Sequence, residues 1–248
     1  MAVAKPVAAK GTLEFSRTHH WPLFVVIALT LVAAPFSFDV LGHTGALVLN
    51  LLLYAAGAFS VARNTRLLVA STIAGMAAAL LQIAIVWGGN RDVVLAVAFH
   101  VASIAFVTIV GAHVLSALLR TASVTGDTVL GGVTAYLLLG VLFAFLYSLA
   151  ETVQPGSFTL PASMTQTGDV MTWIPTPIDS EASESGELHL LYFSFTTMST
   201  LGYGDIAPRS PIARSLSSVE SVLGQLYLAI FIARLVSVAR MQVGGKEK

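Results

Sequence analysis

The sequence of 248 residues contains no cysteine, which excludes disulfide bonds and thiol chemistry. Charged residues are scarce: Asp, Glu, Lys and Arg make up 10% of the chain, against about 25% in an average soluble domain. Hydrophobic residues reach 56%, and the mean hydropathy is +0.82. A water-soluble domain cannot bury that much apolar surface, so the composition predicts an integral membrane protein.

Six apolar segments are long enough to cross about 30 Å of hydrocarbon as helices. The predicted spans are residues 21–38, 41–61, 67–87, 93–119, 128–149 and 215–238. Residues 190–199 predict a further helix that is too short to need to span the bilayer. Neither a soluble domain nor an internal repeat is recognisable between these segments.

The basic residues predict how the chain is oriented, because Lys and Arg concentrate on the cytoplasmic side of membrane proteins. With six spans, one side carries Lys5, Lys10, Arg17, Arg63, Arg66, Arg120, Arg240, Lys246 and Lys248. The other side carries Asp39, Asp92, Glu151, Asp169, Asp179, Glu181, Glu184, Glu187 and Asp205, with Arg91, Arg209 and Arg214. We therefore expect a multi-pass protein of the plasma or inner membrane with both termini in the cytoplasm.

The first basic residues leave an alternative open. Lys5, Lys10 and Arg17 followed by an apolar run also fit a signal peptide, with small residues at 32–34 near a cleavage site. Both the apolar run and the basic segment are long for a signal peptide, which favours an uncleaved first helix.

The predicted fourth span lacks the charges that a voltage sensor uses. No Lys or Arg lies between Arg91 and Arg120. Moving one charge through the membrane field supplies ~2.3 kcal/mol per 100 mV, so an uncharged helix does little electrical work. We expect weak or absent voltage dependence.

Residues 197–205 read Thr-Met-Ser-Thr-Leu-Gly-Tyr-Gly-Asp and lie between two long apolar segments. Irregular backbone at membrane depth is tolerated where it is buried in protein or lines a water-filled path. Gly202 and Gly204 can adopt positive φ and so turn consecutive carbonyls towards one axis. Thr-x-Gly-Tyr-Gly loops use such carbonyls to replace the hydration shell of K⁺.

The side chains of this stretch are expected to have separate roles. Thr200 can add a hydroxyl oxygen at the inner end, and Asp205 places a negative charge at the outer mouth. Leu201 and Tyr203 are expected to turn away from the ions and wedge against the surrounding protein.

Residues 191–205, Leu-Tyr-Phe-Ser-Phe-Thr-Thr-Met-Ser-Thr-Leu-Gly-Tyr-Gly-Asp, resemble the pore helix and selectivity filter of the potassium channel family. The resemblance extends through residues 206–208 into the last apolar segment, where residues 222–235 resemble the inner helix of bacterial members. It covers roughly residues 128–240; the first half is similar only in its number of segments. Leu201 stands where the family usually has Val, and only its carbonyl would touch the ion.

The resemblance implies an all-α membrane protein with six transmembrane helices, a re-entrant pore helix and a selectivity-filter loop. It also implies a homotetramer, because the filter is built from four such loops. The implied divisions are a cytoplasmic tail at 1–20, a four-helix domain at 21–119, a pore domain at 128–240 and a cytoplasmic tail at 241–248. The pore domain would comprise an outer helix, an external turret at 151–186, the pore helix and filter at 190–205, and the inner helix at 212–240.

The resemblance also assigns the site. K⁺ would bind at Thr200, Leu201, Gly202 and Tyr203, and Gly204 would complete the filter. Thr196, Thr197, Asp205 and Glu220 would support it. 

Two residues of the last helix carry more specific expectations. Glu220 is an acid in an otherwise apolar helix, so we expect it to face the back of the filter and form a hydrogen bond near the pore helix. Gly224 is either a gating hinge or a site of close packing, and Arg234 is expected at the inner interface.

The sequence therefore predicts a potassium-selective channel that conducts K⁺ passively, with no cofactor, no enzymatic activity and no nucleic-acid partner, surrounded by membrane lipids. A weakly selective cation channel is an alternative, although Tyr203 argues against it. A haem- or metal-binding membrane protein built on His100 and His113 is another. The separation of His100 and His113 is not the i, i+4 spacing of a helical metal pair. Neutral histidines that form hydrogen bonds between helices are therefore favoured over a metal site.

The acidic residues on the external side have two possible roles: they either concentrate cations near the pore or form an ordinary solvated face.

Overall fold

The structure, a computed structural model, describes residues 20–41, 43–88, 92–120, 124–159 and 181–244. Its helices are α1 (Trp21–Leu41), α2 (His43–Ser60), α3 (Thr65–Gly88), α4 (Val93–Arg120), α5 (Gly126–Val153), α6 (Glu181–Met198) and α7 (Pro211–Gly244). Two short strands, β1 (Phe158–Thr159) and β2 (Ala207–Pro208), pair antiparallel. The predicted helical class is confirmed, with this pairing as a small addition.

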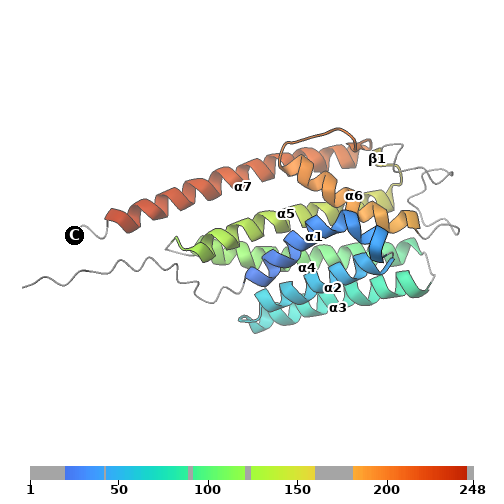
Figure 1. Ribbon diagram of the computed structural model, residues 1–248, viewed down its shortest axis with the longest axis horizontal. Helices are drawn as coiled ribbons and strands as arrows, with labels where there is room; N and C mark the ends of the chain where they lie inside the picture. Colours follow the sequence, from blue (N-terminus) through green and yellow to red (C-terminus); the bar gives the residue numbers. More distant parts are fainter. Residues whose placement is uncertain (1–19, 42, 89–91, 121–123, 160–180, 245–248) are drawn as a thin grey trace, which may run out of the picture.

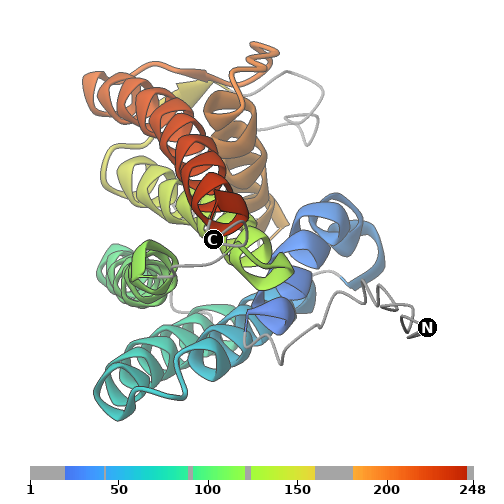
Figure 2. The ribbon, with the colours of Figure 1, turned by 90° about the vertical axis from the view of Figure 1, so that its left-hand side faces the viewer.

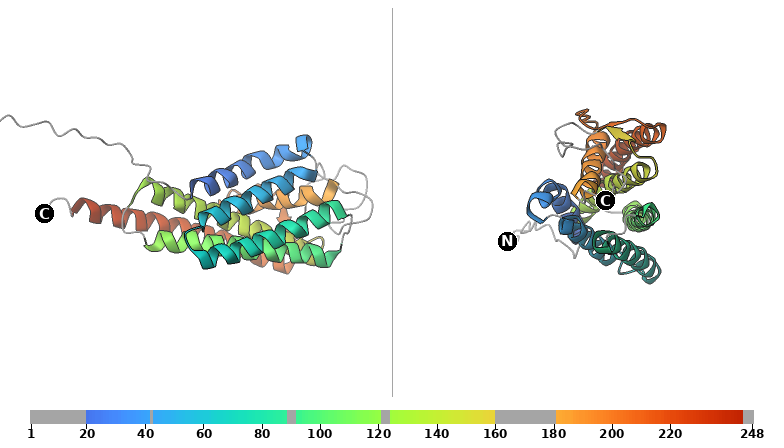
Figure 3. Two further views of the ribbon diagram at one scale, coloured as in Figure 1. Left: turned by 90° about the horizontal axis from the view of Figure 1, so that it is seen from below. Right: turned by 90° about the vertical axis from the view of Figure 1, so that its right-hand side faces the viewer.

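The long helices run back and forth along one axis (Figure 1). The α2–α3 turn, the start of α5 and the end of α7 lie at one end of the bundle. The end of α1, the start of α2, the start of α6 and β1 lie at the other. Helix α6 occupies only part of the long axis, beside the end of α5 (Figure 3). This is the arrangement expected of a short helix that enters from one end.

Four of the described helices are long and apolar enough to cross a membrane: Thr65–Trp87, Val93–Arg120, Gly126–Val153 and Pro211–Val238. The protein is therefore a multi-pass membrane protein. Two shorter apolar stretches, Trp21–Val32 and Gly45–Ser60, belong to α1 and α2. Six spans remain a prediction, because these two stretches as described fall short of a bilayer-spanning length.

Helix α5 is the centre of the molecule, contacting α1, α4, α6 and α7. Seen along the bundle, α3 and α4 lie away from α6 and α7, with α5 between them (Figure 2). Leu138, Val141 and Phe145 of α5 are buried in the main apolar core. Leu23 and Ile27 of α1 are fully buried in the same core, so α1 is an integral part of the bundle.

Helices α2, α3 and α4 pack closely around one aromatic ring. A Cβ atom at Gly57 would lie 2.5 Å from Cζ of Phe106, and one at Gly75 would lie 3.1 Å from its Cδ2. The Tyr54 and Phe106 rings meet edge to face with centroids 5.0 Å apart. Small residues thus let these helices approach, as is usual in membrane bundles.

Three predicted limits in the pore region need correction. Helix α5 continues to Val153, so the external loop does not begin at residue 151. Helix α6 begins at Glu181 rather than at residue 190. Helix α7 extends to Gly244, beyond the predicted limit of 240. Residues 1–19 and 160–180, which include most of the predicted tail and turret, lie outside the described part of the chain.

Candidate functional site

The candidate site begins where α6 ends. The carbonyl of Thr196 accepts hydrogen bonds from the amides of Leu201 (2.9 Å) and Gly202 (3.1 Å). The carbonyl of Thr197 accepts one from the amide of Thr200 at 3.0 Å. Carbonyls at a helix C-terminus lack partners within the helix, and here the following loop supplies them. The loop is thereby fixed to the end of α6.

Every second residue of the loop has a left-handed backbone. Thr200 has φ of 60°, Gly202 of 55° and Gly204 of 78°, whereas Leu201 and Tyr203 do not have positive φ. In an extended strand successive carbonyls point to opposite sides. Reversing the sign of φ at alternate residues removes that alternation and lets carbonyls share one side. Among the described residues, Thr200 is the one non-glycine residue with positive φ. This conformation is uncommon and marks the loop as specialised.

The side chains of the loop are largely uncovered within one chain. Leu201 is 57% exposed and Tyr203 is 68% exposed. The Tyr203 ring stacks on the Tyr192 ring of α6, with centroids 6.4 Å apart and planes 5° apart. A single subunit therefore supplies only part of the surroundings against which these side chains are expected to pack.

Asp205 joins the loop to α6. Its Oδ2 accepts a hydrogen bond from the Tyr192 hydroxyl at 2.9 Å, and its Oδ1 accepts one from the Ile206 amide at 3.0 Å. Burial, with a smaller effect of this bond and the Asp205 charge, raises the pKa of Tyr192 to about 12. Burial also lowers the pKa of nearby His189, and the charge of Asp205 opposes that change.

Glu220 of α7 is buried at the junction of three helices. It is fully buried, and it accepts hydrogen bonds from the Tyr147 hydroxyl of α5 and from the Ser194 hydroxyl of α6, the latter at 2.5 Å. The Ser194 hydroxyl also lies 2.7 Å from the carbonyl of Gly140. The expected contact between Glu220 and α6 is present, and a buried carboxyl needs such partners.

Glu151 is also buried, at 3% exposure, so the prediction that it is an acid of the external surface is wrong. Its carboxyl oxygens accept hydrogen bonds from the amides of Gly156 (2.6 Å) and Phe158 (3.1 Å). These bonds hold the turn that leads into β1, which pairs with β2 just after the loop. The physical reason is local: the carboxyl satisfies buried amides of the turn that follows its own helix.

Gly224 of α7 lies against the C-terminus of α6. A Cβ atom there would be 2.6 Å from Cγ of Met198 and 2.9 Å from its carbonyl oxygen. The same carbonyl accepts hydrogen bonds from Gln225 (3.3 Å) and Tyr136 (3.4 Å). Close packing at Gly224 is thus observed, and the hinge remains a prediction.

The residues of the haem or metal alternative are not brought into a cluster. His100 is buried, and its Nδ1 lies 2.7 Å from the Ala96 carbonyl. His113 follows further along the same helix, α4. Within the described ranges, no three His, Cys, Asp or Glu side chains lie together in a way that could hold a metal ion.

Arg234 lies at the opposite end of the molecule from the loop. Its guanidinium donates a hydrogen bond to the Leu119 carbonyl at the end of α4. This bond is a direct contact between α4 and α7, and the position of Arg234 at the inner interface stays a prediction.

Sequence reasoning missed several partners in this region: Tyr147, Ser194 and Glu151 are all buried and hydrogen-bonded around the loop. For Tyr147, the only available signal is a polar atom within a long apolar segment, where such atoms need partners. That signal identifies a residue as bonded but does not say to what.

Residues 164–241 match the family described as "Ion channel". This part of the chain is similar to an ion-channel domain. The match covers α6, the loop and most of α7. Over 99 residues, the chain is 29% identical to the inward rectifier potassium channel Kirbac3.1 of Paramagnetospirillum magnetotacticum. That alignment covers 38% of this chain and 24% of the relative's length, and no solved structure matches the chain.

Proposed function

We propose that the protein is a potassium-selective channel that conducts K⁺ passively through a homotetrameric pore. The observation that carries the proposal is the alternating backbone of residues 200–204, with positive φ at Thr200, Gly202 and Gly204. Such a backbone can direct successive carbonyls to one side, as is needed to replace the water around K⁺. The likeness to an inward rectifier potassium channel supports the choice of ion.

Four copies are required because one loop supplies only one side of a ring of carbonyls. The single chain leaves large apolar side chains exposed on α7, including Val219, Leu223 and Ile230, together with Leu201 and Tyr203 of the loop. Neighbouring subunits would cover part of this surface. In the tetramer, the C-terminal ends of the four α6 helices would point towards the central cavity, where the negative end of each dipole favours a cation.

The proposed topology has six spans with both termini in the cytoplasm. The two ends of the bundle agree with it: the α2–α3 turn, the start of α5 and the end of α7 lie together, as parity requires (Figure 1). Helix α4 carries no Lys or Arg before Arg120, so we propose that conduction depends weakly or not at all on voltage.

The test is a flux assay on purified protein reconstituted into liposomes with an outward K⁺ gradient. We expect K⁺ efflux that Ba²⁺ blocks and a much smaller flux when Na⁺ replaces K⁺. Equal fluxes of the two ions would favour the weakly selective channel. No flux above that of protein-free liposomes would contradict both proposals.

A further inference from the structure

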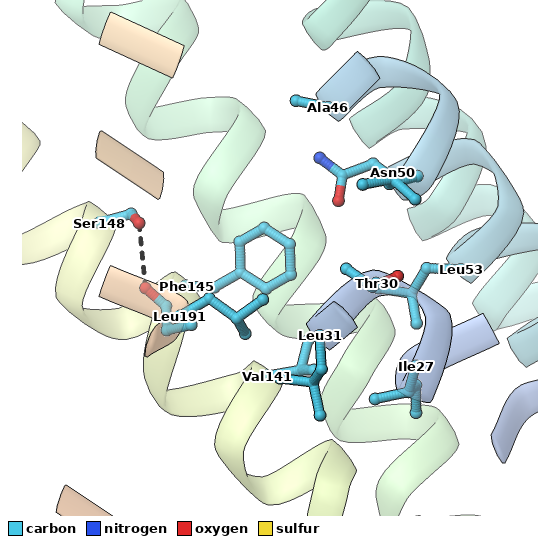
Figure 4. Close-up of a pocket in the computed structure, with 12 residues that line it drawn as sticks. Ile27, Thr30, Leu31, Ala46, Asn50, Leu53, Val141, Phe145, Ser148 and Leu191 are labelled. Atoms are coloured by element: carbon cyan, nitrogen blue, oxygen red, sulfur yellow. Dashed lines mark hydrogen bonds between the residues drawn. The ribbon is translucent and has the colours of Figure 1, made fainter. Parts of the chain in front are cut away.

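A cavity lies between the first two helices and the pore region, in the part of the bundle near α6. It is lined by residues of α1, α2, α5 and α6, with a volume of about 50 Å³, and it is partly open to the surroundings. Figure 4 shows side chains of α1, α2 and α5 around the ring of Phe145, with Leu191 of α6 nearby. The cavity is thus lined by α1, α2, α5 and α6 together.

The lining is mainly hydrocarbon. Its apolar side chains include Ile27, Leu31, Leu49, Leu53, Val141 and Phe145. The polar residues offer little to a polar guest. The hydroxyls of Thr30 and Ser148 donate to carbonyls of their own helices, at 2.8 Å and 3.0 Å. The amide nitrogen of Asn50 donates to Gln82 at 3.3 Å.

The lining suits hydrocarbon better than water. A buried water needs about 10–15 Å³ and two to four polar partners. The cavity is large enough for more than one water, but its hydroxyl donors are already used. Apolar cavities of this kind stay dry and bind hydrocarbon. Because the chain is a multi-pass membrane protein and the cavity is partly open, lipid chains are the hydrocarbon available to it.

We propose that this cavity takes up the terminal carbons of one hydrocarbon chain of a membrane lipid, bound between α1, α2 and the pore region. The chain contacts Leu191, the residue before Tyr192, which donates its hydroxyl hydrogen to Asp205 beside the candidate filter. The bound lipid therefore contacts the residue next to Tyr192, whose hydrogen bond to Asp205 links α6 with the end of the loop. The proposal depends on membrane insertion and not on K⁺ selectivity.

The experiment uses the full chain in liposomes of phosphatidylcholine that carries a photoreactive diazirine on one acyl chain. After illumination, labelled peptides are located by mass spectrometry. We expect labels on Leu49, Leu53 and Phe145 within the cavity, besides labels on the exposed α3 residues Val69 and Ile73. Labels on α3 with none in the cavity would overturn the proposal.

Two variants that fill the cavity from different helices sharpen the test. Ala144→Phe on α5 and Ala46→Leu on α2 both add volume to the lining. Each is expected to reduce cavity labelling by about tenfold, which corresponds to ~1.4 kcal/mol of lost binding. The matched control, Ala70→Phe, adds the same ring on the exposed surface of α3 and is expected to leave cavity labelling unchanged.

Helical content and elution volume establish that each variant is folded before labelling is compared. Unchanged cavity labelling in both folded cavity variants would overturn the proposal. So would cross-linking of the cavity to a second copy of the chain in place of lipid. Because labelling is read without ion flux, a failed flux assay with normal labelling would reject the proposed channel function alone.

Discussion

The two halves of the molecule are held together in different ways. In α1–α4, helices approach through small residues, as at Gly57 and Gly75 against the ring of Phe106. In α5–α7, helices also approach at glycine, as at Gly224 against Met198, and buried carboxyl groups are added, of which Glu220 joins α7 to α5 and α6. Among the described residues, the buried acids are Glu151 and Glu220, and both belong to this second half.

The difference follows from what each half must hold. Apolar packing has no preferred direction, and it suffices where helices need only stay together. A loop with left-handed backbone at alternate residues stays in place only if its surroundings determine it. Hydrogen bonds to carboxyl groups have direction, and they are expensive to leave unmade at buried positions. Two such carboxyl groups contact α6, the helix that leads into the loop: Glu220 accepts from Ser194, and Asp205 accepts from Tyr192.

The largest expected effect comes from the backbone of the loop. Neither Gly202 nor Gly111 has an atom within 4 Å of an added Cβ, but only Gly202 has positive φ, at 55°. A side chain in the left-handed region costs about 1–2 kcal/mol per residue. Since the proposed tetramer has four copies, Gly202→Ala is expected to abolish K⁺ flux into liposomes. Gly111→Ala on α4 is the control and should conduct normally; equal flux in both variants would contradict the filter assignment.

The next effect concerns the carboxyl group that links three helices. Glu220→Ala removes the carboxyl that accepts from the Tyr147 hydroxyl, whereas the Ser194 hydroxyl keeps the Gly140 carbonyl as an acceptor. An unsatisfied buried group costs about 1–3 kcal/mol and the removed side-chain atoms leave a cavity, so the free energy of unfolding should fall by about 2–5 kcal/mol. Glu220→Gln keeps an amide at the same place and should lose less. Denaturant unfolding followed by circular dichroism measures both, and equal losses would show that the hydrogen bonds contribute little.

A smaller effect is expected in the half formed by α1–α4. In Gly57→Ala, the new Cβ would lie 2.5 Å from Cζ of Phe106, so the ring or the helix must shift. Overpacking of this kind costs about 1–3 kcal/mol. We expect lower thermal stability with K⁺ selectivity retained, because the ring lies away from the loop. Loss of selectivity in a folded protein would show that the two halves are not separable.

The smallest expected effect is a change in the pKa of Tyr192. The pKa of Tyr192 is raised to about 12, so its hydroxyl still donates to Asp205 throughout the neutral range. The pKa of Tyr192 in the folded protein lies above the ordinary value of about 10. The contribution of its protonated hydroxyl to stability is therefore complete below pH 10 and is lost as the pH rises through 12. Asp205→Asn should move the phenolate absorbance of Tyr192, taken as a difference against Tyr192→Phe, towards lower pH. If the titration of the phenolate absorbance does not move, Asp205 is not a cause of the raised pKa of Tyr192.

Helices and the loop were predictable because they depend on local sequence. Apolar length predicts α3, α4, α5 and α7, and the glycine pattern predicts positive φ at Gly202 and Gly204. Positive φ at Thr200 is not predictable from residue type, because a β-branched side chain disfavours it. Its amide bonds to the carbonyl of Thr197, and that contact exists only once α6 has ended.

The polar partners were less predictable because they join distant parts of the chain. Glu220 could be expected to contact α6, but its second partner, Tyr147, is supplied by α5 and has no sequence signature. Glu151 reads as one of many external acids, and only the turn at Gly156 and Phe158 shows why it is buried. Hydropathy identifies which residues avoid water, whereas the tertiary arrangement decides which polar groups meet.

The most direct test of the central claim is the reversal potential in a planar bilayer with K⁺ on one side and Na⁺ on the other. A tenfold preference for K⁺ moves this potential by about 60 mV, since 100 mV corresponds to ~2.3 kcal/mol per charge. We expect the natural chain to reverse well towards the K⁺ equilibrium potential and Tyr203→Asp to reverse near zero. A natural chain that itself reverses near zero, or a Tyr203→Asp variant with an unchanged reversal potential, would contradict the account.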